Sequence, residues 1–271
     1  MIKLLKANFS RLKKELSLWI VAGVTLALTV PKIVDSYKYV KNVKLDDMFF
    51  EMIPFIGVLY AVFIALYIGK EYSDKAMRNK LIVGHKRENI YLANFITCFF
   101  GSLIIFSMIP LGNCCVGIPL VGGWKGEIST LITYILISVC FTAAIVSVLT
   151  LFCMLCSKHA VSAVLAITIA FLLMLIASII YNALSAPELT SEMIMTPDGI
   201  EVGDPMPNPV YVSGTQRTVY EFLMQFLPTG QGILAANREI THPVLNIIYS
   251  VGITVIVNLC GIFAFKKKDL K

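Results

Sequence analysis

Residues 128–157, ISTLITYILISVCFTAAIVSVLTLFCMLCS, contain no charged side chain and decide the fold of this chain. A helix needs roughly 20 apolar residues to cross the hydrocarbon of a bilayer, and this stretch exceeds that length. It therefore predicts a membrane-spanning helix. An ionisable residue inside a span is the usual mark of a proton or ion relay, and none is present here.

Four further charge-free stretches flank this one: residues 52–68, 90–123, 160–186 and 243–265. A sixth, residues 16–30, is shorter, but Pro31 and a snorkelling Lys32 extend it to the interface. It follows a basic segment as in a signal peptide, yet no small-residue cleavage site follows, so we expect a retained first helix. The chain is 57% hydrophobic and 15% charged. We predict an all-α integral membrane protein with six transmembrane helices, in one domain over residues 1–271.

The basic residues indicate how the chain is oriented in the membrane. Most of the 23 Lys and Arg fall in the N-terminal segment, residues 69–90 and the C-terminal tail. Residues 187–242 instead carry seven acidic and two basic residues. Because cytoplasmic loops are enriched in Lys and Arg, both termini are expected in the cytoplasm. The net charge of +6 is explained by this topology, so we expect no nucleic-acid partner.

Motifs for nucleotide binding, metal binding and catalysis are absent from the sequence. It has no GxxxxGK[ST], GxGxxG or HExxH pattern, and its three histidines are scattered over separate predicted loops. Cys153 and Cys156 have CxxC spacing without a second pair or a nearby histidine, which favours packing over a metal site. We therefore expect no enzyme activity, no metal and no cofactor in this chain.

Two segments outside the spans have amphipathic helical patterns. Residues 1–15 place apolar side chains at helical spacing among lysines, which predicts an interfacial helix on the inner leaflet or a plain basic anchor. In residues 187–242, the first part reads as an exposed loop. The second part contains an apolar helical face over residues 219–227 that ends at Pro228. Nine residues are too few to span a bilayer, so this second segment is expected to be interfacial or re-entrant.

Small residues recur every four positions in the second span. They are Gly57, Ala61, Ala65 and Gly69. Such a stripe lets a neighbouring helix backbone approach closely in lipid. It fits an internal helix pair or a subunit interface, and we favour internal packing.

Residues 69–90 form the most polar cytoplasmic stretch and predict a short amphipathic helix. Ser73 is the expected N-cap and Gly84 the expected stop. A short amphipathic helix outside the membrane either lies on the headgroups or docks a partner protein. Composition alone is compatible with both.

The run GKEYSDKAMRNKL over residues 69–81, followed by Gly84, Arg87 and Tyr91, resembles the cytoplasmic loop of ABC-2 type transporter permeases. Those of bacterial antimicrobial-peptide and bacteriocin export or immunity systems are the most similar. The run FLPTGQ over residues 226–231 is similar to the motif before their last span. The chain departs from the family at Lys75 and Ala76, where a glycine followed by a threonine is usual.

The resemblance implies an ATP-driven machine in which this chain is the permease. Two copies of a separate ABC ATPase subunit would bind ATP and magnesium, and a second permease, identical or homologous, would complete the membrane part. The implied ATPase-coupling residues are Glu71, Met77, Arg78, Lys80, Leu81 and Arg87. The implied re-entrant element contains Phe226, Pro228, Thr229 and Gly230. The implied location is a bacterial plasma membrane, in contact with membrane lipid.

The implied cargo is a peptide, drug or lipid-like amphipathic molecule that is exported or removed from the membrane. The sequence is compatible with two other functions. One is an ATPase-independent channel or secondary carrier. The other is an immunity subunit that senses a peptide, since the acidic outer segment could attract cationic peptides at low ionic strength.

Overall fold

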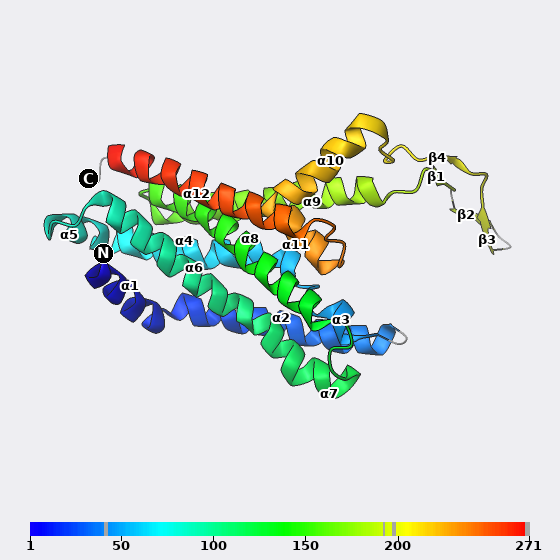
Figure 1. Cartoon of the computed structure of the whole chain (residues 1–271), viewed down its shortest axis with the longest axis horizontal. Coiled ribbons are helices and arrows are strands. Elements are labelled where there is room, and N and C mark those ends of the chain that lie inside the picture. Colours follow the sequence, from blue (N-terminus) through cyan, green and yellow to red (C-terminus); the bar gives the residue numbers. More distant parts are fainter. Residues whose placement is uncertain (41–42, 192, 197–198, 269–271) are drawn as a thin grey trace.

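The computed structural model describes residues 1–40, 43–191, 193–196 and 199–268. Long helices run along the length of an elongated bundle (Figure 1). Over the described residues, six helical segments are long and apolar enough to cross a membrane, which confirms the predicted spans as helices. They are α2 (Leu16–Tyr39), α4 (Ile53–Ser73), α6 with its extension (Arg87–Val121), α8 (Ile128–Leu155), α9 (His159–Ser185) and α12 (Pro243–Lys267).

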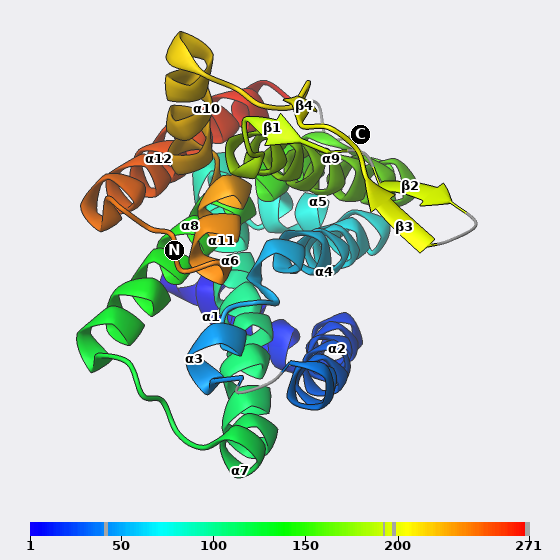
Figure 2. The same cartoon turned by 90° about the vertical axis from the view of Figure 1, so that its right-hand side faces the viewer.

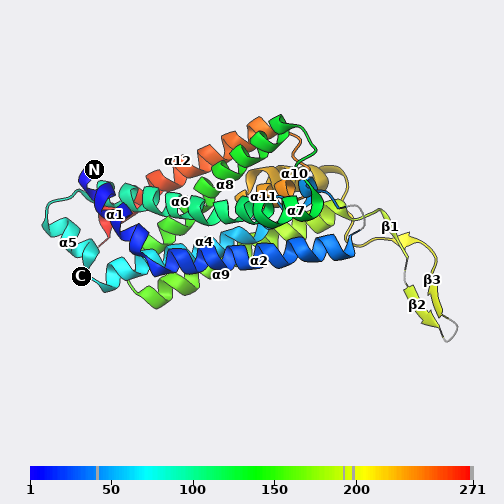
Figure 3. The ribbon, with the colours of Figure 1, turned by 90° about the horizontal axis from the view of Figure 1, so that it is seen from below.

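The two ends of the bundle carry different elements. The end with both termini, here called the terminus end, carries α1 (Ile2–Lys14) and α5 (Ala76–Ile82) (Figures 1 and 3). The opposite end, here called the hairpin end, carries short strands and the helices α10 (Gly214–Phe226) and α11 (Pro228–Ala236). The short helix α3 (Leu45–Met48) lies at this end too.

The core of the bundle is built on α4, the span with the largest buried share. α4 packs against α8 and α9, and α12 packs mainly on α8. Viewed along the bundle, α2 and α12 lie on opposite sides, with α4, α6 and α8 between them (Figure 2). α9 and α12 bury the smallest shares of the spans, so their apolar outer faces are available to lipid.

The third span is irregular near the hairpin end. α6 (Arg87–Gly112) continues into a π-helical turn, Asn113–Gly117, and then α7 (Ile118–Val121). The buried amide of Asn113 donates to the Ile109 carbonyl at 3.0 Å. α6 itself continues past Pro110, and the π-helical turn joins it to α7, so the long charge-free stretch forms one extended span.

The segment after α9 differs from the predicted loop. It forms two short antiparallel pairs, in which β1 (Leu189–Thr190) pairs with β4 (Met206–Pro207) and β2 (Met193–Thr196) pairs with β3 (Gly199–Val202). The prediction that the next helix simply ends at Pro228 was incomplete. α10 ends at Phe226, and Pro228 starts α11, because proline is favoured in the first turn of a helix.

Candidate functional site

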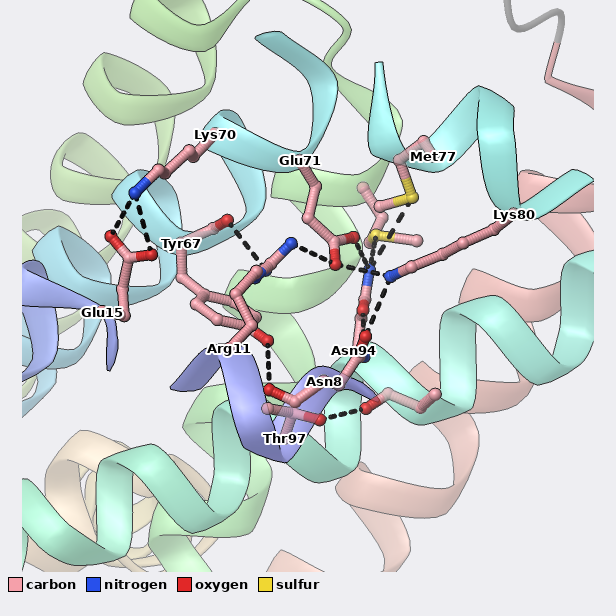
Figure 4. Close-up of polar contacts among 12 residues, drawn as sticks. Asn8, Arg11, Glu15, Tyr67, Lys70, Glu71, Met77, Lys80, Asn94 and Thr97 are labelled. Carbon is pink, nitrogen blue, oxygen red and sulfur yellow. Dashed lines mark hydrogen bonds and ion pairs between the residues drawn. The ribbon is translucent and has the colours of Figure 1, made fainter. Parts of the chain in front are cut away.

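Glu71, in the last turn of α4, is the centre of a buried polar cluster at the terminus end (Figure 4). Its side chain is fully buried. Glu71 Oε1 lies 2.6 Å from Arg11 Nη1 in α1 and 2.5 Å from Lys80 Nζ in α5. Asn94 of α6 donates through Nδ2 to Glu71 Oε2 at 2.7 Å. One carboxylate therefore fastens α1, α5 and α6 to the end of α4.

Asn8 completes this group, which we call the Glu71 cluster: Asn8, Arg11, Glu71, Lys80 and Asn94. Asn8 Nδ2 donates to Asn94 Oδ1 at 2.8 Å, and Lys80 Nζ donates to Asn8 Oδ1 at 3.0 Å. A buried charge is tolerated when it is paired and its remaining hydrogen-bonding positions are filled. The cluster meets this condition for Glu71, since both carboxylate oxygens have partners.

The cluster is held firmly by its surroundings. The Arg11 guanidinium lies 4.0 Å from the centroid of the Tyr67 ring, and Tyr67 OH donates to the Asn8 carbonyl at 3.3 Å. Asn94 Nδ2 also lies 3.4 Å from the sulfur of Met154 in α8.

Burial lowers the pKa of Lys80, and the nearby Glu71 carboxylate opposes this shift. The cluster carries two cations and one anion.

The loop helix α5 has well-defined ends that differ in part from the prediction. Ser73 was the expected N-cap, but α4 continues through it and its hydroxyl donates to the Gly69 carbonyl at 3.2 Å. α5 begins after Lys75, which has a φ of 55°, a left-handed conformation that glycine adopts most easily. This is where the resembled family usually has glycine. At the other end, Gly84 has a φ of 90°, as expected for a helix stop.

Not all of the ATPase-coupling residues that the resemblance implies face outward. Met77 is buried and Lys80 points into the Glu71 cluster, so with Glu71 they contact the interior rather than a partner. Leu81 is partly buried against the core. The outward surface has Arg78 at its side and an apolar tip at Ile82 and Val83, which are 73% and 75% exposed.

Arg87 belongs to a different arrangement, a clamp on the C-terminal end of α12. Its guanidinium donates to the carbonyls of Phe265 at 3.2 Å and Lys266 at 3.3 Å, and to that of Lys268. Lys268 Nζ in turn donates to Tyr72 OH and to the Met154 carbonyl, both at 2.9 Å. The clamp joins α12 to α4, α6 and α8 beside the Glu71 cluster.

The stripe of small residues on α4 is buried inside the chain. Ala61 and Ala65 are fully buried. A Cβ at Gly57 would lie 3.0 Å from Ile145 Cδ1 of α8, and one at Gly69 would overlap the His159 ring of α9. The stripe therefore serves contacts with α8 and α9.

At the hairpin end, the residues of the predicted re-entrant element anchor α11. Thr229 Oγ1 donates to the Leu173 carbonyl of α9 at 2.9 Å. Gly230 lies against the backbone of Met224, leaving no space for a Cβ. Pro228 is buried, whereas Phe226 stays partly exposed and stacks on Phe222. α11 is thus packed inside the bundle.

Several residues that the structure brings together carry no functional signal in the sequence. Asn94 lies within a charge-free span, and Asn8 and Arg11 lie in a segment whose pattern predicts an interfacial helix or a basic anchor. Asn8 and Arg11 are three residues apart on α1, which places them on one face of the helix. The sequence does not reveal that this face contacts Asn94 and Glu71. Gln231 ends the run FLPTGQ, but its contacts are not evident from the sequence: it accepts from Ser250 Oγ at 2.7 Å and donates to the Asn246 carbonyl at 3.0 Å.

Within the described ranges, no three His, Cys, Asp or Glu side chains lie close enough to hold a metal ion. A comparison with models of known protein families gives no match, and a comparison with curated proteins gives none either.

Proposed function

We propose that this chain is the permease subunit of an ATP-driven transporter, with α5 as the helix that docks a separate ATPase subunit. The observation that carries the proposal is the apolar tip Ile82–Val83 at the end of a short helix, outside the spans. An exposed apolar pair beside charged residues is the kind of surface that a partner protein covers. The resemblance of residues 69–81 to ABC-2 type loops supports the same function.

The Glu71 cluster supplies a way for force on α5 to reach the membrane part. Lys80 of α5 is bound to Glu71 of α4, and Glu71 is bound to α1 and α6. Movement of α5 therefore displaces three other elements together. Closure of two ATPase subunits would push on two such loops and shift the two permeases relative to each other.

In this proposal the terminus end faces the cytoplasm of a bacterium, as the distribution of basic residues favours. α1 lies on the inner leaflet, and ATP and magnesium belong to the ATPase. The cargo is an amphipathic peptide, drug or lipid-like molecule, which passes at the interface with a second permease.

A peptide-sensing immunity subunit is the second candidate, favoured by a cavity at the hairpin end. The cavity has a volume of about 660 Å³ and lies between α9, α10 and the segment around α11. The residues that line it include Arg217, Glu221, Glu239 and Met224. Glu221 is paired with Arg217 at 3.1 Å, so Glu239 provides the excess negative charge.

Purification of the tagged chain from its native membrane, after crosslinking, tests the ATPase proposal. We expect a stoichiometric partner that carries a GxxxxGK[ST] loop and hydrolyses ATP. Val83→Asp should lower its recovery at least tenfold, because a charge would be buried at the contact. Val210→Asp, a matched change at an exposed valine of the hairpin end, should leave recovery unchanged.

Two outcomes would contradict the proposal. A preparation without any nucleotide-binding partner would favour an ATPase-independent channel or carrier. Full recovery of the ATPase with Val83→Asp would show that the tip of α5 is not the docking surface.

A further inference from the structure

A second cavity lies at the terminus end, where three spans begin or end. Its volume is about 450 Å³, and it is bounded by the first turns of α2, the last turns of α4 and the start of α9. Ser17, Lys70 and His159 line its polar part, and Ile20, Val62 and Leu66 line its apolar part. None of the contacts that fasten the Glu71 cluster uses this space.

The lining changes from polar to apolar along the direction of the spans. Lys70 lies at the end of α4, Leu66 about one turn deeper and Val62 about two turns deeper. The same order holds from Ser17 to Ile20 on α2. Ile20 is 54% exposed, so the cavity is open sideways to the hydrocarbon. This gradient matches a molecule with a polar head and an apolar tail lying at the bilayer interface.

The charges at the polar end favour an anionic head. Lys70 Nζ lies 3.2 Å from Glu15 Oε2, but the lysine is half exposed while the glutamate is almost buried. Glu15 also accepts a hydrogen bond from Ser17 Oγ at 3.4 Å, so its carboxylate is bound by groups of the protein itself. Lys14 and Lys158 adjoin the lining residues Glu15 and His159 in sequence, and the N-terminal end of α9 adds positive potential.

We infer that this cavity binds an anionic phospholipid. The phosphate is held by Lys70 and His159 at the start of α9, and an acyl chain lies along Ile20, Val62 and Leu66. Basic residues near a membrane surface attract acidic lipids, and here an apolar slot under the lysine adds selectivity for a lipid over a free anion. The inference needs the membrane placement of the spans but not the ATPase, so it is tested separately from the proposed function.

Native mass spectrometry of the full chain in detergent, titrated with phosphatidylglycerol or phosphatidylcholine, tests the site. We expect tighter binding of phosphatidylglycerol. Lys70→Gln should weaken it about fivefold, the effect of one interfacial lysine. Glu15→Gln should strengthen it, because the carboxylate that competes for Lys70 is lost. Lys32→Gln is the matched control, since Lys32 forms a comparable half-exposed pair with Glu51 near the other end of α2.

A variant that fills the cavity locates the bound lipid. Leu66→Trp should remove the high-affinity phosphatidylglycerol without lowering the melting temperature. Equal binding of the two lipids, or equal effects of Lys70→Gln and Lys32→Gln, would overturn the inference. Undiminished binding to a folded Leu66→Trp chain would overturn it too. If Leu66→Trp does not fold, the opposite signs expected for Lys70→Gln and Glu15→Gln still decide the question.

Discussion

The two ends of this protein use charge in different ways. At the terminus end, Glu71 is fully buried and binds Arg11 and Lys80 at once. At the hairpin end, the ion pair between Arg238 and Asp47 is isolated and substantially exposed. A shared, buried anion joins several elements, whereas an exposed pair stabilises the contact between α3 and the turn after α11 only weakly.

In the proposed transporter, the ATPase would act on the terminus end, where the buried ion pairs lie. The Glu71 cluster and the clamp at Arg87 connect five helices next to α5. The hairpin end is joined to the bundle mainly by apolar packing: Met224 of α10 and Ile233 of α11 are buried with Ala177 and Ile180 of α9. Substitutions at each end test this contrast.

Glu71→Ala should cost about 3–5 kcal/mol in the free energy of unfolding, because it leaves Arg11 and Lys80 largely buried without their anion. Denaturant titration in detergent, followed by circular dichroism, measures the loss. Adding Lys80→Met to Glu71→Ala should recover part of it, since one unpaired cation is then removed.

Asp47→Ala is the control at the hairpin end. It removes a carboxylate from an exposed pair, and its expected cost is below about 1 kcal/mol. Equal losses for Glu71→Ala and Asp47→Ala would remove the contrast between the two ends.

Gly230→Ala should cost about 1–3 kcal/mol, although it lies at the hairpin end and changes no charge. The new Cβ would overlap the backbone of Met224, which α10 holds in place. Gly232→Ala, two residues along α11, is the matched control. There the nearest atom, Ile53 Cγ2, would be 3.4 Å away, an ordinary contact. Thermal unfolding of both variants decides whether tight packing extends to this end; equal melting temperatures would contradict it.

The spans could be predicted because the bilayer excludes charge, a constraint that acts on each stretch of sequence by itself. The continuation of α2 beyond Lys32 to Tyr39 and the start of α11 at Pro228 could not be predicted in the same way. Proline either ends a helix or begins one, and only the packing of the following residues decides between these outcomes.

The Glu71 cluster could not be predicted, because its members are far apart in the sequence. Asn8 and Asn94 are 86 residues apart, yet their side chains are hydrogen-bonded. A glutamate just after an apolar span looks like a solvated loop residue until its partners are known. The sequence pattern therefore located the loop helix. The resemblance, however, implied that Glu71, Met77 and Lys80 face a partner, whereas all three side chains point inward.

Lys268 provides a test of the clamp by pH. Burial against Tyr72 and Met154 lowers the pKa of Lys268 to about 8, from about 10.4 for an exposed lysine. The folded chain binds this proton less tightly than the unfolded chain, so raising the pH from about 8 to 10 should stabilise the clamp. Acetylation of Lys268, followed by mass spectrometry, should be half-maximal near pH 8.

Tyr72→Ala is the companion variant for this measurement. Opening one wall of the site should return the midpoint of Lys268 acetylation toward that of an exposed lysine. A wild-type midpoint already near pH 10.4 would show that the tail is not held in the clamp.

The smallest expected effect is at Arg238, where an ion pair competes with backbone strain. Arg238 and Gly84 occupy the same position in the same helix-ending motif. The next residue donates its N–H to the carbonyl five positions back, as Glu239 does to Leu234 and His85 to Lys80. Arg238 has a φ of 60°, which costs a residue with a Cβ roughly 1 kcal/mol.

Arg238→Gly should therefore be about as stable as the wild type, because relief of this strain offsets the lost contacts with Asp47 and Trp124. Arg238→Gln keeps the strain and loses the charge, so it should be less stable by up to about 1 kcal/mol, and the difference from wild type should shrink at high salt. Thermal unfolding at two salt concentrations measures both. If both variants were far less stable than the wild type, the ion pair would contribute strongly to stability, and the hairpin end would resemble the terminus end after all.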